Sequence, residues 1–247
     1  MANFVLVHGA WHGAWCWQRV LPALVRAGHR AHAVTLTGLG ERAHLLHPDI
    51  DLDTHIRDVQ MLIKAEELQD VVLVVHSYAG MIGTALADRD DGRLRQLVYL
   101  DAVLPQPGES WSSTHAPATR EARLASAAAD PRGSFEAPAP ALFGLAGDDA
   151  AWVARRQTRH PGRPYTQVLQ FDPQRVARVP LHYIACTAPP LATMQVSQAR
   201  LRDPQFWGGA WQRVGTVQAL ATGHDPMVSD PEGLTQCLLQ LVASTSA

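Results

Sequence analysis

Short apolar runs of strand length alternate with longer stretches of helical periodicity through the first part of the chain. The run at residues 71–75 is entirely apolar, which is typical of a strand covered on both faces. Between the runs, apolar side chains recur at the spacing of amphipathic helices. This alternation predicts a mostly parallel α/β sheet with helices on both faces. The predicted strands are residues 4–7, 31–36, 71–75 and 97–100, and the predicted helices are residues 15–27, 54–68 and 77–87.

Individual residues set the expected ends of two of these helices. Gly28 stands where a C-cap glycine would end the first helix. Pro22 lies inside the same stretch, so we expect either a kink or a late helix start. Thr54 is the expected N-cap of the second helix.

The alternation stops between residues 105 and 180. This stretch is rich in Ala, Pro, Arg and Ser and shows no run of strand type, so it is predicted to be an inserted and mostly helical lid, or cap. Residues 1–104 and 181–247 would then form the core. In that second part the pattern predicts strands at 181–186 and 214–220 and helices at 194–201 and 231–242.

Composition narrows the possible partners and location. The 247 residues carry 21 Lys and Arg against 23 Asp and Glu, and this net charge of −2 disfavours nucleic-acid binding. No apolar run is long enough to span a membrane, and the N-terminus lacks the features of a signal peptide. Cys16, Cys186 and Cys237 form no CxxC pair and are expected to be free thiols. We therefore expect a soluble, cytoplasmic protein, a monomer or homodimer, that acts on a small molecule.

The segment around Ser77 carries the clearest chemical signal. A buried strand runs directly into this serine, and a helix follows, as in a nucleophile elbow. The usual G-x-S-x-G pattern has glycine on both sides, whereas Val75 and Ala79 occupy those positions here. The alternative interpretation is a serine that only caps a helix after a strand.

Two further loops fit the same chemistry. Ala10 follows the first predicted strand, so its backbone N–H could form an oxyanion hole with that of Tyr78. His224 lies between the last predicted strand and the last helix, from where it could reach Ser77 as a general base. A single histidine among the 12 of this chain means little. Three such segments in the right order favour a hydrolytic site without metal or cofactor.

Over essentially its whole length the sequence resembles the α/β-hydrolases. It is most similar to the branch of plant methyl-ester esterases, hydroxynitrile lyases and bacterial esterases, and within it to bacterial hydrolases of benzimidazole carbamates such as carbendazim. The resemblance implies an α/β-hydrolase fold, Ser77 as nucleophile and His224 as base. It rests on the doubled His-Gly-Ala-Trp at residues 8–15, the loop at 36–40, His76-Ser77-Tyr78 and Gly223-His224.

The position of the acidic residue in this chain differs from the usual position in this family. The branch usually carries it in a Cys-Thr-x-Asp segment after the penultimate strand, but the chain has Pro189 in that place. Asp101 ends an earlier strand, a position that some other α/β-hydrolases use for the acid. We therefore predict Asp101 as the third member of the triad. Its alternative role is to cap the turn that follows the strand.

The same family resemblance separates the reaction classes. Hydroxynitrile lyases of this branch carry a threonine in the oxyanion loop and a lysine beside the histidine, where this chain has Gly9 and Asp225. Cleavage of a small, largely apolar ester or carbamate through an acyl- or carbamoyl-enzyme is therefore the favoured function. A hydroxynitrile lyase-like C–C lyase and a non-catalytic binding protein are the alternatives.

Other sequence features have ordinary structural explanations. His8 and His12 are four residues apart, but their glycine-rich loop does not fit a zinc site. Gly38 and Gly40 are too few for a dinucleotide fingerprint. The residues expected to line the substrate pocket are Gly9, Trp11, Cys16, Trp111 and Trp152.

Overall fold

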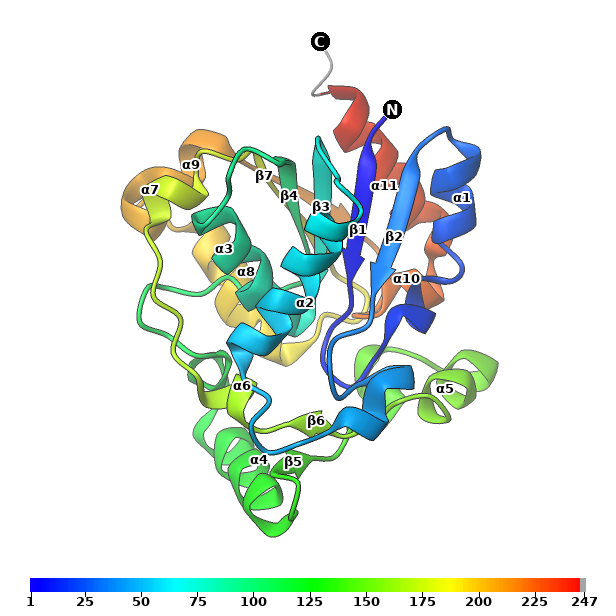
Figure 1. The fold of residues 1–247 in the computed structure, drawn as a ribbon, viewed down its shortest axis with the longest axis vertical. Coiled ribbons are helices and arrows are strands. Elements are labelled where there is room, and N and C mark those ends of the chain that lie inside the picture. The colour runs from blue at the N-terminus through cyan, green and yellow to red at the C-terminus, as the bar shows by residue number, and fades with distance from the viewer. Residues whose placement is uncertain (245–247) are drawn as a thin grey trace.

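The computed structural model describes residues 1–244, and within them six parallel strands form one sheet (Figure 1). The order across the sheet is β2-β1-β3-β4-β7-β8, and every neighbouring pair is parallel. The predicted α/β fold is thus confirmed, and all six predicted strands are present. Their bounds are β1 Asn3–Val7, β2 Arg30–Val34, β3 Val71–His76, β4 Leu94–Leu100, β7 Leu181–Cys186 and β8 Gly215–Leu220.

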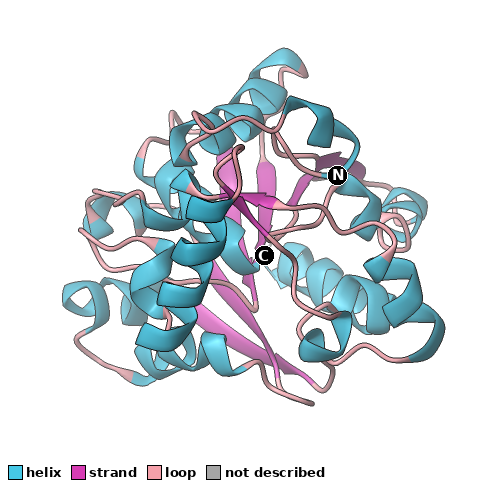
Figure 2. Cartoon of the chain, turned by 90° about the horizontal axis from the view of Figure 1, so that it is seen from below, coloured by secondary structure: helices cyan, strands magenta, loops and turns pink. Residues whose placement is uncertain are grey.

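Helices cover both faces of this sheet, as the view along the strands shows (Figure 2). In Figure 1, α2 (Leu52–Ala65) and α3 (Gly80–Asp88) lie in front of the strands, and α11 (Pro231–Ser244) lies behind them. The double cover explains why β3 is entirely buried. None of the helices in residues 1–244 is long and apolar enough to cross a bilayer.

The strand order places a crevice at the carboxyl end of the sheet. The chain passes from β1 to the edge strand β2 and then returns to the other side of β1 to form β3. The loops that follow β1 and β3 therefore leave the sheet in opposite directions, which is where open α/β sheets bind their ligands. His8 and Ser77, the residues that follow β1 and β3, lie at this point.

Two helix starts show how local chemistry set the boundaries. Pro22 lies in the first turn of α1 (Leu21–Arg26), after a 3-10 turn at Ala14–Trp17, so the late start is confirmed. The N-cap of α2 was predicted wrongly as Thr54. Asp51 is the cap instead, because its Oδ1 accepts a hydrogen bond from the Thr54 N–H at 2.8 Å, and Thr54 completes a capping box.

Residues 105–180 contain mainly short helices, as predicted, but the expectation of no strand was wrong. A two-residue strand, β5 (Ser134–Phe135), pairs antiparallel with β6 (His160–Pro161). Strands this short show no periodicity, and a proline within one conceals it further. In Figure 1 these strands lie beyond the carboxyl ends of β1 and β2, where a lid would lie. The helices are α4 (Pro117–Ala129), α5 (Gly147–Ala154), α6 (Arg163–Thr166) and α7 (Pro173–Val176), with 3-10 turns at Trp111–Thr114 and Pro140–Phe143.

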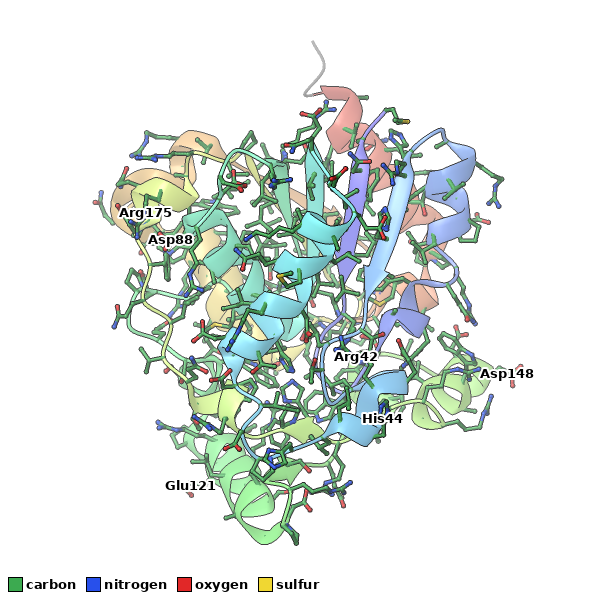
Figure 3. The ribbon with its side chains drawn as sticks, in the orientation of Figure 1. Arg42, His44, Asp88, Glu121, Asp148 and Arg175 are labelled. Carbon is green, nitrogen blue, oxygen red and sulfur yellow. The ribbon has the colours of Figure 1, made fainter. Side chains whose placement is uncertain are left out.

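Several ion pairs connect this segment to the core. Arg175 of α7 donates through Nε to Asp88 Oδ1, at the end of α3, at 2.8 Å (Figure 3). Beyond α7 the chain forms β7, then α8 (Gln195–Arg202), close to the predicted helix at 194–201, and α9 (Ala210–Val214), which the sequence pattern did not predict. After β8, α10 (Pro226–Ser229) precedes α11.

Candidate active site

Ser77 lies in a sharp turn between β3 and α3. Its backbone φ is +57°, in the left-handed region that non-glycine residues rarely occupy. The turn needs close packing, since a Cβ added at Gly80 would lie 2.0 Å from the carbonyl oxygen of Val103. Val75, one of the two departures from the usual motif, is accommodated by Gly83 of α3. A Cβ at Gly83 would lie 2.9 Å from the Val75 methyl groups, so the missing side chain makes room for the valine.

Ser77, His224 and Asp101 form a continuous hydrogen-bonded chain. His224 Nε2 lies 2.9 Å from Ser77 Oγ, and His224 Nδ1 lies 2.7 Å from Asp101 Oδ2. All three side chains are buried. An ionised carboxylate only accepts hydrogen bonds, so Nδ1 carries the ring proton and Nε2 is left to accept the serine proton.

The Asp101 carboxylate is oriented from both sides. Oδ2 faces His224, and Oδ1 accepts longer hydrogen bonds, both at 3.4 Å, from the Cys186 N–H and the Gln198 side chain. The expected contact between Asp101 and the His224 ring is therefore present. Pro189, in the position of the acid in related sequences, is exposed.

The loop after β1 packs directly on the serine. A Cβ at Gly9 would lie 2.8 Å from Ser77 Cβ, which brings the Gly9–Ala10 peptide beside Ser77. His8 Nδ1 donates to the Gly9 carbonyl at 2.7 Å, and His8 Nε2 accepts from the Leu36 N–H at 3.1 Å. Burial lowers the pKa of His8 to about 3, so the ring is neutral. The bond fixes a peptide whose other end is the Ala10 N–H; Ala10 and Tyr78 are both buried.

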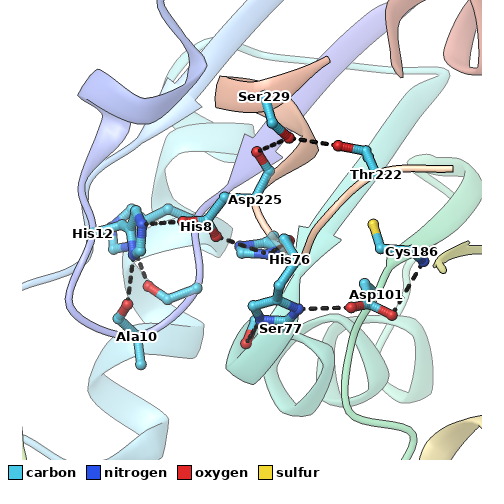
Figure 4. Close-up of polar contacts among 12 residues, drawn as sticks. His8, Ala10, His12, His76, Ser77, Asp101, Cys186, Thr222, Asp225 and Ser229 are labelled. Carbon is cyan, nitrogen blue, oxygen red and sulfur yellow. Dashed lines mark hydrogen bonds and ion pairs between the residues drawn. The ribbon is translucent and has the colours of Figure 1, made fainter. Parts of the chain in front are cut away.

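A second imidazole–carboxylate pair, between His12 and Asp225, was not foreseen from the sequence. His12 Nε2 lies 3.1 Å from Asp225 Oδ2, and His12 Nδ1 donates to the Ala10 carbonyl at 2.8 Å (Figure 4). Burial opposes both charges, but each group offsets this for the other, so the pKa of His12 is raised and that of Asp225 is lowered. The pair joins the loop after β1 to the loop of His224. Both residues belong to motifs that the sequence analysis singled out, although their separation along the chain hid the contact.

The described residues contain one cluster with the spacing of metal ligands, formed by His76, His224 and Asp225. Both ring nitrogens of His224 already have partners in Ser77 and Asp101, and His76 Nε2 donates to the His224 carbonyl at 2.8 Å. A metal ion would have to displace these hydrogen bonds. The His8 and His12 rings bind different partners and do not form such a group.

A small cavity lies beside Ser77 and His224. Trp11 and Trp111 line it, as expected. Gly9, Cys16 and Trp152 do not: Cys16 is fully buried, and Trp152 packs on Trp15, with 5.0 Å between ring centroids. The other lining residues were not predicted, because they come from segments whose path the sequence does not show: His115, Arg123, Leu142, Phe143, Leu191, Thr193 and Met194.

Comparison with known proteins identifies the family of this chain. The alpha/beta hydrolase family matches residues 4–236. A carbendazim-hydrolysing esterase from Nocardioides is 48% identical over 164 residues, which are 63% of this chain and 68% of that protein. A pheophorbidase from Raphanus sativus is 39% identical over 116 residues, which are 47% of this chain and 44% of that protein. An extracellular alpha/beta-hydrolase from Paenibacillus superimposes with a TM-score of 0.78 at 18% identity, covering 97% of this chain and 98% of that one, which shows the fold alone.

These matches confirm the branch that the sequence motifs indicated, and they support an esterase or hydrolase activity on this fold.

Proposed function

Because this chain belongs to the alpha/beta hydrolase family, we propose that it is a serine hydrolase that cleaves a small, largely apolar ester or carbamate. The observation that carries the proposal is the buried hydrogen-bonded chain from Ser77 Oγ through His224 to Asp101. A serine that merely capped α3 would need neither a histidine at 2.9 Å nor a carboxylate behind it.

In the first half of the reaction, Ser77 Oγ attacks the substrate carbonyl carbon while His224 Nε2 takes the hydroxyl proton. Asp101 holds the ring in the productive tautomer and stabilises the imidazolium that forms. The tetrahedral intermediate collapses when the bond to the leaving group breaks and His224 protonates the departing alcohol or amine. The product of this half-reaction is an acyl- or carbamoyl-enzyme on Ser77.

In the second half, water replaces the leaving group. His224 accepts a proton from water as its oxygen attacks the carbonyl carbon, and then returns a proton to Ser77 Oγ as the acid or carbamic acid leaves. In both halves the N–H groups of Ala10 and Tyr78 would hold the oxyanion. Removal of one such donor costs about 3–4 kcal/mol of transition-state stabilisation in comparable sites.

The cavity favours a flat and mostly apolar substrate. Aromatic and aliphatic side chains make up most of its lining, including Trp11, Trp111 and Phe143. Carbamates are poorer electrophiles than esters because the nitrogen donates into the carbonyl, so their hydrolysis depends strongly on positioning. The similarity to a carbendazim-hydrolysing esterase supports including carbamates among the substrates.

The two alternatives, a hydroxynitrile lyase-like C–C lyase and a non-catalytic binding protein, have less support. The threonine that marks the related lyases has no room at Gly9, where a Cβ would lie 2.8 Å from His76 Nδ1 and from Ser77 Cβ. Their lysine position holds Asp225, which is buried against His12. A protein that only bound its ligand would have no need for the aligned Ser77, His224 and Asp101.

The experiment is a substrate panel of p-nitrophenyl esters, aryl methylcarbamates and one aromatic cyanohydrin. We expect turnover of esters or carbamates and none of the cyanohydrin beyond background. Release of cyanide would support the lyase alternative, and binding without turnover of any compound would support the binding protein. Ser77→Ala is the matched control, since it removes one oxygen and leaves the cavity otherwise unchanged.

A further inference from the structure

A positive charge without a carboxylate partner lines the cavity beside Ser77. Arg123 of α4 is one of its lining residues, together with Ser77 and His224. Its guanidinium carbon lies 5.0 to 5.7 Å from the centroids of four rings, within the range of cation–π contacts. Those rings belong to Trp11, Trp111, Phe135 and Tyr165.

The polar neighbours of Arg123 are neutral. Its Nη1 donates to His115 Nε2 at 3.2 Å, and its guanidinium carbon lies 5.3 Å from the centroid of the Tyr165 ring. Burial and the nearby Arg123 charge lower the pKa of His115 to about 3, so that ring carries no charge. Among residues 1–244, no Asp or Glu oxygen lies within 4.0 Å of the Arg123 guanidinium.

Other partly buried arginines of this protein are neutralised. Arg200 forms a two-pronged pair with Glu109, at 2.7 and 2.8 Å, and Arg159 pairs with Asp130 at 3.2 Å and Glu136 at 2.8 Å. Burying a charge without a counter-ion is costly, and aromatic faces offset that cost only in part. No acidic residue lines the cavity. The charge in the cavity that Ser77 also lines is therefore left for a ligand to neutralise.

We infer that Arg123 is a specificity-determining residue that binds an anionic group, a carboxylate, on the flat part of the substrate. The inference rests on the proposed hydrolase function and narrows its substrate class to aromatic esters or carbamates that carry one carboxylate. A guanidinium offers five N–H donors in a planar fork that matches a carboxylate. The surrounding rings hold the fork in place and give the substrate ring apolar surfaces to contact.

The test compares two substrates of the same shape, 3-acetoxybenzoate and 3-acetoxybenzamide. Hydrolysis of either breaks the acetyl ester and adds water, giving acetate and the corresponding phenol. Each rate is divided by the rate of the uncatalysed reaction to correct for the difference in leaving group. For the wild type we expect a higher corrected kcat/KM with the benzoate.

In Arg123→Gln, we expect kcat/KM for the benzoate to fall about 10- to 100-fold, the range for a hydrogen bond to a charged group, and that for the benzamide to change less than about threefold. The loss should appear mainly as a higher KM, since the carboxylate is bound equally in the ground and transition states. Arg123→Lys keeps the charge without the fork and should retain part of the preference. Arg120→Gln, an exposed arginine one turn earlier on α4, is the matched control and should change neither substrate.

Three results would overturn the inference. These are a wild-type preference for the benzamide, equal losses for both substrates in Arg123→Gln, and no loss for either substrate in that variant. Equal losses would mean that Arg123 only holds α4 against the aromatic rings. If Arg123→Gln does not fold, the inference is still tested by the substrate preference of the wild type and by that of Arg123→Lys. Failure of the proposed function would look different, because the wild type would then hydrolyse neither compound.

Discussion

The buried pair of His12 and Asp225 makes a prediction in which stability and pH are linked. Both nitrogens of His12 face acceptors, Asp225 Oδ2 at 3.1 Å and the Ala10 carbonyl at 2.8 Å, so the ring is an imidazolium when Asp225 is ionised. Asp225→Asn keeps the shape but removes the charge. His12 can then lose its proton and accept a hydrogen bond from the asparagine amide. The variant replaces a charge-assisted hydrogen bond with a neutral one.

The magnitude follows from that exchange. Hydrogen bonds to charged groups contribute about 1.5–3 kcal/mol and neutral ones about 1 kcal/mol, so Asp225→Asn should cost about 0.5–2 kcal/mol near pH 5.5. For a chain of this size that corresponds to a fall in Tm of roughly 1–8 °C. Asp225→Leu leaves the His12 Nε2 without any partner and should cost more, about 3–5 kcal/mol, as expected when one member of a buried pair is removed.

The pH dependence of the stability loss in Asp225→Asn tests the charge assignment more directly than the size of that loss. The pKa of His12 is raised in the folded protein. Its contribution to folding stability is therefore complete below about pH 6.5, the pKa of His in the unfolded chain, and is lost as the pH rises through the pKa of the folded state. The pKa of Asp225 is lowered, so its contribution is present above about pH 4 and is lost as the pH falls further. The deficit of Asp225→Asn should therefore be largest between about pH 4.5 and 6.5 and shrink at higher pH.

The assay is urea unfolding of the wild type and both variants at half-unit steps from pH 4.5 to 9. A deficit that grows above pH 7, or an asparagine variant as stable as the wild type at every pH, would refute the charge assignment of the pair.

Three shorter predictions follow from the site. Asp101→Asn should lower kcat by about 10³–10⁴ with an unchanged circular dichroism spectrum, because asparagine favours the wrong His224 tautomer; nearly full activity would show that Asp101 is not the acid. Activity should survive dialysis against EDTA, since both ring nitrogens of His224 are occupied by Ser77 and Asp101; a loss that zinc restores would contradict this. Gly80→Ala should destabilise the fold by at least about 1–3 kcal/mol in urea unfolding, because its Cβ would lie 2.0 Å from a carbonyl oxygen; an unchanged midpoint would mean that the elbow yields easily.

The central strands β1, β3, β4 and β7 could be predicted because they are largely buried between the two helix layers. A run such as residues 71–75 reads as a strand without any knowledge of its neighbours, and the parallel alternation then fixes where loops converge. That convergence is why Ser77, His224 and Asp101, far apart in sequence, could be proposed as partners. The ends of helices could be predicted less well. Asp51 and Thr54 can both cap a helix, and only the hydrogen bond from the Thr54 N–H to Asp51 Oδ1 shows that Asp51 is the cap.

The lining of the cavity could not be predicted in the same way. Residues 105–180 fold as short helices and a two-residue strand pair, whose packing depends on contacts with the core rather than on periodicity. Trp152 and Trp111 looked equivalent in sequence, yet one packs on Trp15 and the other lines the cavity. Arg123 had no local signal at all, because its significance lies in the four rings around it and in the missing carboxylate.

Covalent labelling of Ser77 tests the central claim most directly. Wild-type protein would be incubated with a fluorophosphonate and examined by intact-mass and peptide mass spectrometry. We predict one adduct per chain, located on Ser77, with labelling abolished in Ser77→Ala and slowed by orders of magnitude in His224→Ala, because the hydroxyl then lacks its base. Labelling that is absent from the wild type, or that persists unchanged in Ser77→Ala, would contradict the account.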